Sequence, residues 1–317
     1  MQDLWDNAII NDQDVAKTIS DKVQHDLEDK NIEEFLSKIE AFLQVNSDEE
    51  AKSFLNKSKK VILDKCSGFL QTENLDGHKT FLHRLSRRRV RDQRLKVFTT
   101  NYDLCFEYAA GALGSIALDG FSFATPRRYN PLFFSYDIVR RPRGGDDMGN
   151  YLEGVFLLYK LHGSVNWKRV EDGVIIEKTQ PEPGEACLVY PASGKYQQSF
   201  TQPYLESLTQ YLAAVREPNT CVLAVGFGFN DNHLAEPLLT AATSNPHLRL
   251  IIVDPKFEEK IKNGNSYWKQ LNKLKDQGED VWFIPDEFKD FAQRIPDLKS
   301  LTPADTLMKA IQGVTRE

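Results

Sequence analysis

Two short polar residues, Asn101 and Asp103, directly follow an apolar run in the segment Thr99-Thr100-Asn101-Tyr102-Asp103. Side chains at the end of a strand can contact a ligand in a sheet whose strands are parallel. The amide of Asn101 can hold a sugar hydroxyl or a water molecule, and the carboxylate of Asp103 can orient it. Helix capping is an equally good interpretation, because Asn and Asp are favoured at helix N-caps.

A second polar segment, Lys160-Leu161-His162-Gly163-Ser164, also follows an apolar run. Imidazole titrates near neutral pH, so His162 is the histidine best placed to act as a general base. Gly163 permits a close approach of the backbone to another group. The other histidines are interpreted as surface residues of a helical region (His25, His78 and His83), a residue of a helix first turn (His233) and a residue of a turn (His247).

Two further apolar runs end in residues that are suited to binding a nucleotide. Gly226-Phe227-Gly228 precedes a polar stretch with Asp231, which opens a predicted helix. Backbone amides of such a loop and the N-terminus of the helix favour an anion, although a single Gly-x-Gly is a weak signal. Asp254 ends the run at residues 251–253 and can accept hydrogen bonds from ribose hydroxyls. A turn that ends the strand is an equal alternative for Asp254.

Elements that alternate along the chain position these residues. Short apolar runs at residues 96–100, 154–161, 186–190, 221–226, 248–253 and 281–284 alternate with helical patterns at 202–215, 231–243 and 267–275. The alternation predicts an α/β fold with a mostly parallel, Rossmann-like sheet and helices on its faces. The carboxyl ends of parallel strands share one edge, so we expect the four motifs to meet there.

The N-terminal part of the chain differs from the rest. Leu36, Ile39, Phe42 and Leu43 recur at helical spacing, and residues 1–90 contain no proline. We therefore divide the chain into an added helical segment at residues 1–94 and a core at 95–317. Residues 126–150 are basic and rich in turn-forming residues, which predicts a long loop.

The composition excludes several classes of protein. The 317 residues carry a net charge of −6, which gives no general attraction to nucleic acid. The basic segments 84–96 and 140–143 are interpreted as solvated faces or partner contacts. No run of 18 apolar residues and no signal peptide is present, so we expect a cytoplasmic protein that does not enter a membrane. The four cysteines form no Cys-x-x-Cys pair, so no metal site is expected, and Cys105 and Cys221 are interpreted as small core residues.

The order and spacing of the four motifs, over about residues 95–290, resemble those of the sirtuin-like family, most of all its prokaryotic anti-phage branch. The segments Asn-Tyr-Asp-Leu (101–104), Asp-Gly-Phe-Ser (119–122) and Tyr-Pro-x-x-x-Lys-Tyr (190–196) resemble sirtuin-like subunits that assemble with a HerA-type ATPase. The resemblance implies NAD as the substrate, which is cleaved to nicotinamide and ADP-ribose in a gated homo-oligomer.

The resemblance also implies roles for individual residues. Asn101 and Asp103 would hold the nicotinamide ribose and a water molecule, and His162 would be the catalytic base. The residues expected to contact NAD are Thr99, Thr100, Gly163, Ser164, Gly226, Phe227, Gly228, Asp231 and Asp254.

Two departures from the family pattern leave alternatives open. Deacylating sirtuins carry two zinc-binding cysteine pairs, and their absence favours NAD cleavage over protein deacylation. Family members begin with a Gly-Ala-Gly loop that cradles the pyrophosphate, whereas residues 1–5 resemble the segment after that loop. We therefore expect the native reading frame to continue upstream of Met1 with a Gly-rich strand and turn. The alternatives are a sensor that binds NAD or ADP-ribose without turnover, and an assembly subunit that docks through its helical segment.

Overall fold

The computed structural model describes residues 5–6, 13–28, 30, 32–68, 75–88, 92–141, 151–171, 173–182, 185–188, 202–299, 307–308 and 311. Its helices are α2 (Gln13–Val23), α3 (Ile32–Val45), α4 (Glu49–Gly68), α5 (Asp76–Leu85), α6 (Cys105–Leu113), the 3-10 helix η2 (Pro131–Ser135), α8 (Tyr204–Ala214), α9 (Asn232–Ser244), α10 (Phe257–Asn263), α11 (Ser266–Asp276) and α12 (Phe288–Arg294). Its strands are β1 (Leu95–Thr99), β2 (Ile116–Leu118), β3 (Val155–Lys160), β4 (Gly163–Arg169), β5 (Ile175–Glu177), β6 (Ala186–Leu188), β7 (Cys221–Val225), β8 (Arg249–Val253) and β9 (Val281–Ile284).

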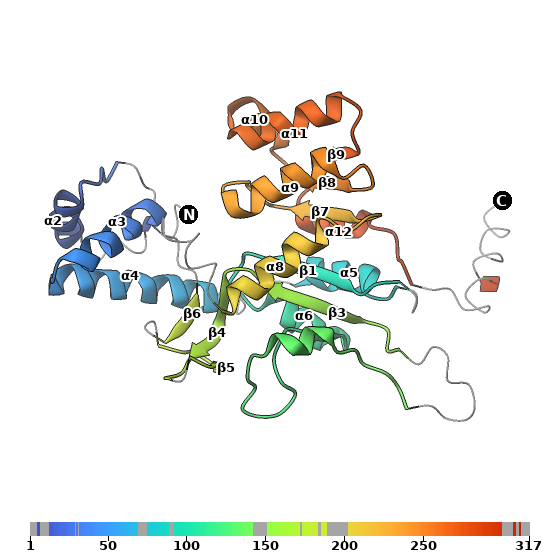
Figure 1. Cartoon of the computed structure of the whole chain (residues 1–317), viewed down its shortest axis with the longest axis horizontal. Coiled ribbons are helices and arrows are strands. Elements are labelled where there is room, and N and C mark those ends of the chain that lie inside the picture. The colour runs from blue at the N-terminus through green and yellow to red at the C-terminus, as the bar shows by residue number, and fades with distance from the viewer. Residues whose placement is uncertain are drawn as a thin grey trace.

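The centre of the fold consists of parallel strands, as predicted. β3 pairs with β1 on one side and β2 on the other, and β8 pairs with β7 and β9, all in parallel. The two three-stranded sheets lie one above the other in Figure 1. Within the described residues β1 and β7 are edge strands, so the parallel sheet is present in two pieces.

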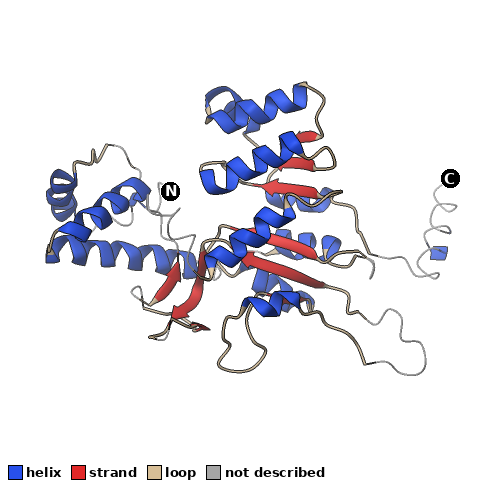
Figure 2. Cartoon of the chain, in the orientation of Figure 1, coloured by secondary structure: helices blue, strands red, loops and turns tan. Residues whose placement is uncertain are grey.

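Helices lie on both sides of these strands (Figure 2), and each set of helices forms a hydrophobic core with one face of them. Helices α8, α9 and α11 pack over Leu250 and Ile252 on one face. Helices α5, α6 and α12 pack over Phe156, Leu158 and Val253 on the other. Successive side chains of a strand point to opposite faces, which explains why Ile252 and Val253 belong to different cores. The near-continuous apolar sequence of β3 is typical of a parallel strand that is covered on both sides.

The apolar run at residues 186–190 was predicted to belong to the parallel sheet, and this prediction was wrong for its described part. β6 pairs antiparallel with β4, which also pairs with β5. The chain turns at residues 161–162 immediately after β3 and leaves the parallel sheet as β4. A three-residue apolar run is compatible with either kind of sheet, so periodicity alone could not identify its partner.

Helices α2, α3 and α4 form a separate core, and the helical spacing predicted for this region is confirmed. Ile32, Phe35, Leu36 and Ile39 of α3 are fully buried in it. The same core includes Val165 of β4 and Leu188 of β6, so the three helices attach to the small antiparallel sheet (Figure 1). Helix α5 packs with the parallel sheet instead. The division of the chain between residues 94 and 95 stays a prediction.

Three side chains differ in exposure from their predicted positions. His25, expected at the surface, is buried and stacks on Phe35 with ring centroids 4.9 Å apart. His78 lies between the rings of Phe106 and Phe288. Cys221 is exposed because it begins the edge strand β7, whereas Cys105 is buried as predicted.

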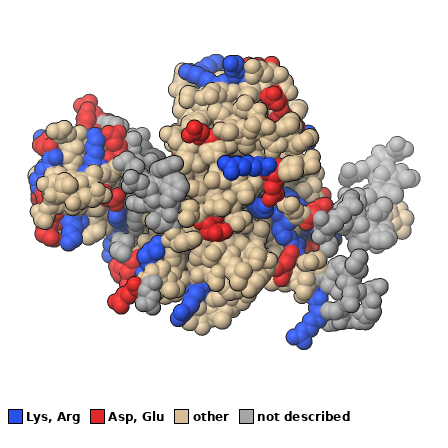
Figure 3. Space-filling view, viewed as in Figure 1, with Lys and Arg blue, Asp and Glu red and all other residues tan. Residues whose placement is uncertain are grey.

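The surface carries both signs of charge. Figure 3 shows basic and acidic side chains interspersed around a largely uncharged centre. In the basic segment 84–96, Arg87 pairs with Asp297, and Arg94 pairs with Asp137. Internal pairing of these guanidinium groups lowers the charge they offer to another molecule. Within the described ranges, none of the helices has the length and apolar character needed to cross a bilayer.

Candidate active site

The first two predicted motifs meet at the carboxyl ends of β1 and β3. The register places Thr99 opposite Lys160, so residues 100–103 and 161–164 leave the sheet side by side. The amide of Leu161 donates to the carbonyl of Thr99 at 2.8 Å, and the amide of Val165 donates to the carbonyl of Tyr102 at 3.0 Å. Backbone hydrogen bonds therefore fix the two segments to each other, as the shared strand edge predicted.

A buried ammonium group supports the first segment. Lys160 Nζ donates to the backbone carbonyl of Asp103 and lies 3.2 Å from Glu107 Oε1, on α6. The Lys160 side chain is 2% exposed. Burial raises the pKa of the Glu107 carboxyl, and the Lys160 ammonium opposes that shift. Sequence reasoning gave Lys160 no role, because a lysine at the end of a strand is typical of a solvated surface.

The structure separates the two candidates of the first motif. Asp103 Oδ1 accepts a hydrogen bond of 2.9 Å from the amide of Cys105 at the start of α6. This contact stabilises the helix start, the type of role that the capping interpretation gave to Asp103. Asn101 is exposed, its amide donates to Thr99 Oγ1 at 3.1 Å, and the N-cap of α6 is Leu104. Asn101 is therefore not a cap and is accessible to a ligand.

The predicted base, His162, lies in the turn between β3 and β4 and is 2% exposed. Its Nε2 atom is 3.3 Å from Nε2 of His233. His233 is in the first turn of α9, as expected, but sequence reasoning missed this contact because no pattern connects residues that are 71 positions apart. The contact brings the second and third motifs together.

Gly163 is required by packing. It has a φ of 86°, and a Cβ atom at this position would lie 2.0 Å from the carbonyl oxygen of Cys187 in β6. The close approach inferred from the sequence is therefore an approach to β6. Ser164 is fully buried, and its hydroxyl donates to Asn166 Oδ1 at 2.7 Å. The predicted contacts of Gly163 and Ser164 with NAD stay predictions.

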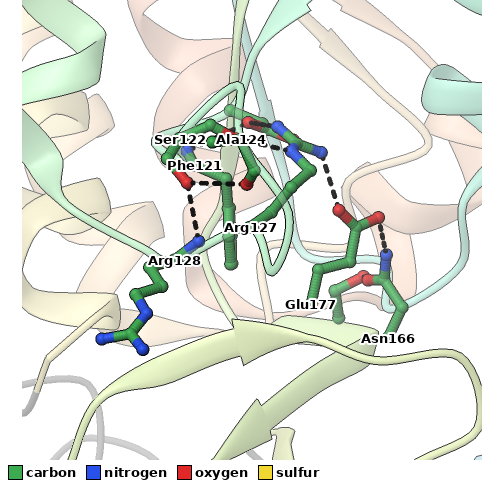
Figure 4. Close-up of polar contacts among 9 residues, drawn as sticks. Phe121, Ser122, Ala124, Arg127, Arg128, Asn166 and Glu177 are labelled. Carbon is green, nitrogen blue, oxygen red and sulfur yellow. Dashed lines mark hydrogen bonds and ion pairs between the residues drawn. The ribbon is translucent and has the colours of Figure 1, made fainter.

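A chain of polar side chains continues from Ser164 to the loop that follows β2. Figure 4 shows its part from Asn166 through Glu177 to Arg127. Asn166 Nδ2 donates to Glu177 Oε1 at 2.9 Å, and Arg127 Nη1 donates to Glu177 Oε2 at 2.8 Å. Arg127 Nη2 also donates to both carboxylate oxygens of Asp119, at 2.7 and 3.0 Å. Sequence reasoning noted Arg127 only as part of a basic loop, because its partners are distant in sequence. The polar chain fixes that loop relative to β4.

The glycine-containing third motif forms a supported loop. Gly226 has a φ of 61°, and the space where its Cβ would lie is open. The carbonyls of Gly228 and Phe229 both accept hydrogen bonds from Asn265 Nδ2, at 3.3 and 2.9 Å. The loop leads to Asp231, the N-cap of the 13-residue helix α9. An open loop at a helix N-terminus is a geometry that suits an anion.

Two other predicted contacts, Phe227 and Asp254, already have partners within the chain. Phe227 is partly buried and lies against Phe229 with ring centroids 4.7 Å apart. Asp254 is 3% exposed, accepts a hydrogen bond of 2.8 Å from the amide of Lys256, and pairs with Lys260. The contacts of Asp254 match the strand-ending turn that the sequence left as an alternative. A ribose hydroxyl at Asp254 would have to share its carboxylate with Lys260.

Three of the cysteines in the described residues are suited to packing rather than to metal binding, whereas Cys221 is exposed. Burial raises the pKa of Cys66 to about 11, and it also raises those of Cys105 and Cys187. A thiol must lose its proton to bind zinc, so a raised pKa disfavours it as a ligand. Within the ranges described above, no group of three or more His, Cys, Asp or Glu residues is arranged to hold a metal ion.

Comparison with known proteins identifies one family. The model of the SIR2-like domain matches residues 95–273, more than half of the 317-residue chain. A search of curated proteins found no match. The matched range includes β1, β3 and α9, which carry the paired segments of the site.

The packing of Gly163 predicts a large loss of stability on Gly163→Ala. The added methyl group would overlap the Cys187 carbonyl, and the positive φ is unfavourable for alanine. We expect a loss of about 3 kcal/mol or more in the free energy of unfolding in urea. Gly111→Ala in α6 is the matched control, because its Cβ meets no atom within 4 Å, and it should be neutral or stabilising. Equal stability of the two variants would contradict the packing role.

The buried Lys160–Glu107 pair predicts a non-additive pair of substitutions. Lys160→Met leaves a buried carboxyl unpaired and the Asp103 carbonyl without its donor, so we expect a loss of about 3–5 kcal/mol. Lys160→Met combined with Glu107→Leu should recover part of this loss, because no buried charge remains. Urea unfolding of the two single variants and the double variant measures the coupling. Additive losses would show that the two side chains do not act as a pair.

Proposed function

The chain belongs to the SIR2-like family, and on that premise we propose that it hydrolyses NAD to nicotinamide and ADP-ribose. SIR2-like domains are NAD-dependent enzymes, so membership implies that the chain binds NAD. The observation that carries the proposal is the meeting of residues 99–103 with residues 160–165 at one strand edge. That edge combines an accessible amide, Asn101, with a buried imidazole, His162.

The described residues fit a dinucleotide. The open loop at Gly226 and the N-terminus of α9 suit its phosphate groups. The contact between His162 and His233 places this helix end next to the predicted base. Thr99 and Thr100 lie at the end of β1 beside Asn101, where the ribose of the nicotinamide half would bind.

Each polar side chain has a separate task in the proposed reaction. Cleavage of the nicotinamide–ribose bond resembles glycoside hydrolysis, in which the sugar gains positive charge in the transition state. Asn101 would hold the attacking water on the ribose face opposite nicotinamide, and Asp103 would stabilise nearby positive charge. His162 would accept a proton from a ribose hydroxyl or from the water. The segment held by Lys160 thus positions Asn101 for its task.

Hydrolysis is favoured over protein deacylation by the chemistry of the cysteines. The sequence has no Cys-x-x-Cys pair, and burial raises the pKa of the Cys66, Cys105 and Cys187 thiols. A structural zinc site with four thiolates requires cysteines that lose their protons readily. Acyl-peptide turnover that depends on NAD would argue against this preference.

Release of nicotinamide from NAD by the purified chain tests the proposal. We expect His162→Ala and Asn101→Ala each to reduce release by about 10²-fold or more, because each removes a group that acts on the reacting atoms. Circular dichroism should show that both variants remain folded. His247→Ala is the matched control, since this histidine is exposed in a turn, and it should keep full activity.

The outcomes separate the candidate functions. Full activity of a folded Asn101→Ala or His162→Ala variant would refute the assigned site. Binding of NAD without release of nicotinamide would favour the sensor. Neither binding nor release would favour a subunit that acts through assembly.

We further propose that the enzyme acts in anti-phage defence as a homo-oligomer that also binds a HerA-type ATPase. The supporting segments Asn-Tyr-Asp-Leu and Asp-Gly-Phe-Ser lie in the described part of the chain, whereas residues 190–196 lie outside it. Helices α2, α3 and α4 form their own core, which packs against Tyr102 and Val165 next to the candidate site, and the exposed side of these helices offers a docking surface. Nucleic acid is not expected to be a direct partner, since Arg87 and Arg94 are paired within the chain.

Light scattering tests the assembly. We expect a mass that is a multiple of 36.3 kDa for the purified chain, and a larger complex after addition of the ATPase. Val45, at the end of α3, is 83% exposed, so Val45→Glu should weaken the complex if α2–α4 dock the partner. Val139→Glu is the control, because Val139 is also exposed but lies in the loop that follows η2. A chain that stays monomeric and forms no complex with the ATPase would contradict the proposal.

A further inference from the structure

We propose that His233 is a positioning residue for the base. Its Nε2 atom accepts a hydrogen bond from the Nε2–H of His162, which fixes the tautomer of His162 and stabilises its imidazolium form. This inference rests on the proposed function of His162 as the base. Nothing in the sequence motif itself connects the two histidines, which come from different strand ends.

The geometry of the two rings supports a direct hydrogen bond. The Nε2 atoms are 3.3 Å apart, and the ring centroids are 5.4 Å apart with an interplanar angle of 37°. His162 is 2% exposed, so its ring has little freedom to move into water. His233 is held in the first turn of α9 by the N-cap Asp231, whose carbonyl accepts from the amides of Leu234 and Ala235. Both rings are thus held on fixed elements.

The proton count determines the direction of the hydrogen bond. Two neutral imidazoles at this distance can place one hydrogen between their Nε2 atoms, with either ring as the donor. Once His162 has accepted a proton it carries N–H groups on both ring nitrogens. The pair then stays attractive only if His233 Nε2 offers a lone pair. His233 must therefore carry its own hydrogen on Nδ1.

The location of His233 favours that acceptor role. The N-terminus of a helix carries partial positive charge, which disfavours a protonated imidazole there. The proposed acceptor role requires that His233 stay neutral while His162 gains the proton. In the resting state His162 has its hydrogen on Nε2 and uses Nδ1 to accept the proton of a substrate hydroxyl or water. The O–H bond breaks, the Nδ1–H bond forms, and no proton has to pass to His233. A carboxylate has the equivalent role in hydrolases that use a serine and a histidine.

Nuclear magnetic resonance of the ring nitrogens tests the inference without any substrate. The full chain is labelled with ¹⁵N-histidine, and the resonances are assigned with His162→Gln and His233→Gln. We expect the Nε2–H tautomer for His162 and the Nδ1–H tautomer for His233. In His233→Leu, which removes the acceptor, the His162 signals should show exchange between the two tautomers. The opposite tautomers in the wild-type chain, or an unchanged His162 spectrum in His233→Leu, would overturn the assignment.

Kinetics provide the second readout. We expect His233→Leu to reduce kcat for NAD cleavage by about 10- to 100-fold with KM changed by less than about threefold, as for other residues that orient a reacting group. His233→Gln offers a carbonyl oxygen as acceptor and should recover most of kcat. Equal kcat in the leucine and wild-type proteins would overturn the positioning role. If the wild-type chain does not cleave NAD, the proposed hydrolysis fails, and the ring tautomers still decide whether His233 accepts from His162. If His233→Leu does not fold, the wild-type spectrum and His233→Gln decide.

Discussion

The register of β1 against β3 is the constraint on which the site depends. Thr99 lies opposite Lys160. The amide of Leu161 donates to the carbonyl of Thr99 at the end of β1, and the amide of Val165 donates to the carbonyl of Tyr102 in the loop that follows. The same register stacks Phe98 on Tyr159 with ring centroids 4.8 Å apart. A shift by one residue would move each side chain to the other face of the sheet. The hydrophobic packing of these two strands thereby also aligns the polar segments at their ends.

The polar groups next to the site stabilise the structure only when each of them has its partners. Lys160 is almost fully buried, and its cost of desolvation is offset by Glu107 and by the carbonyl of Asp103. Glu107 Oε2 makes no hydrogen bond within the described residues, so this carboxylate depends on its contact with Lys160. The chain from Ser164 to Asp119 through Arg127 is connected at each step. The chain is only partly buried, since Arg127 and Glu177 are about a third exposed, but each broken contact would still leave a polar group without its partner.

The candidate site consists of segments from three strand ends, which share two hydrophobic cores. Asn101 follows β1, His162 ends the turn that leads into the antiparallel sheet, and His233 belongs to α9. Tyr102 and Val165 pack in the core of α2–α4, whereas Leu161 packs in the core that contains α9. Helices α2–α4 pack on Val165 and Leu188, in β4 and β6. The helical segment therefore contacts the strand that begins directly after His162. This packing connects α2–α4 to the strand that begins after the turn with His162.

The sequence by itself determined the elements and the order of the motifs. Helical spacing identified α3, and five apolar runs corresponded to parallel strands within one residue at each end. Such patterns are local, because residues on one face of an element lie three or four positions apart in a helix and two positions apart in a strand. Only the tertiary structure decided the partner of β6, the burial of Lys160 beneath Asp103 and the contact of His162 with His233. Lys160 and Asp103 are 57 residues apart in the sequence, and His162 and His233 are 71 apart. The periodicity of one segment does not indicate which distant side chain it will contact.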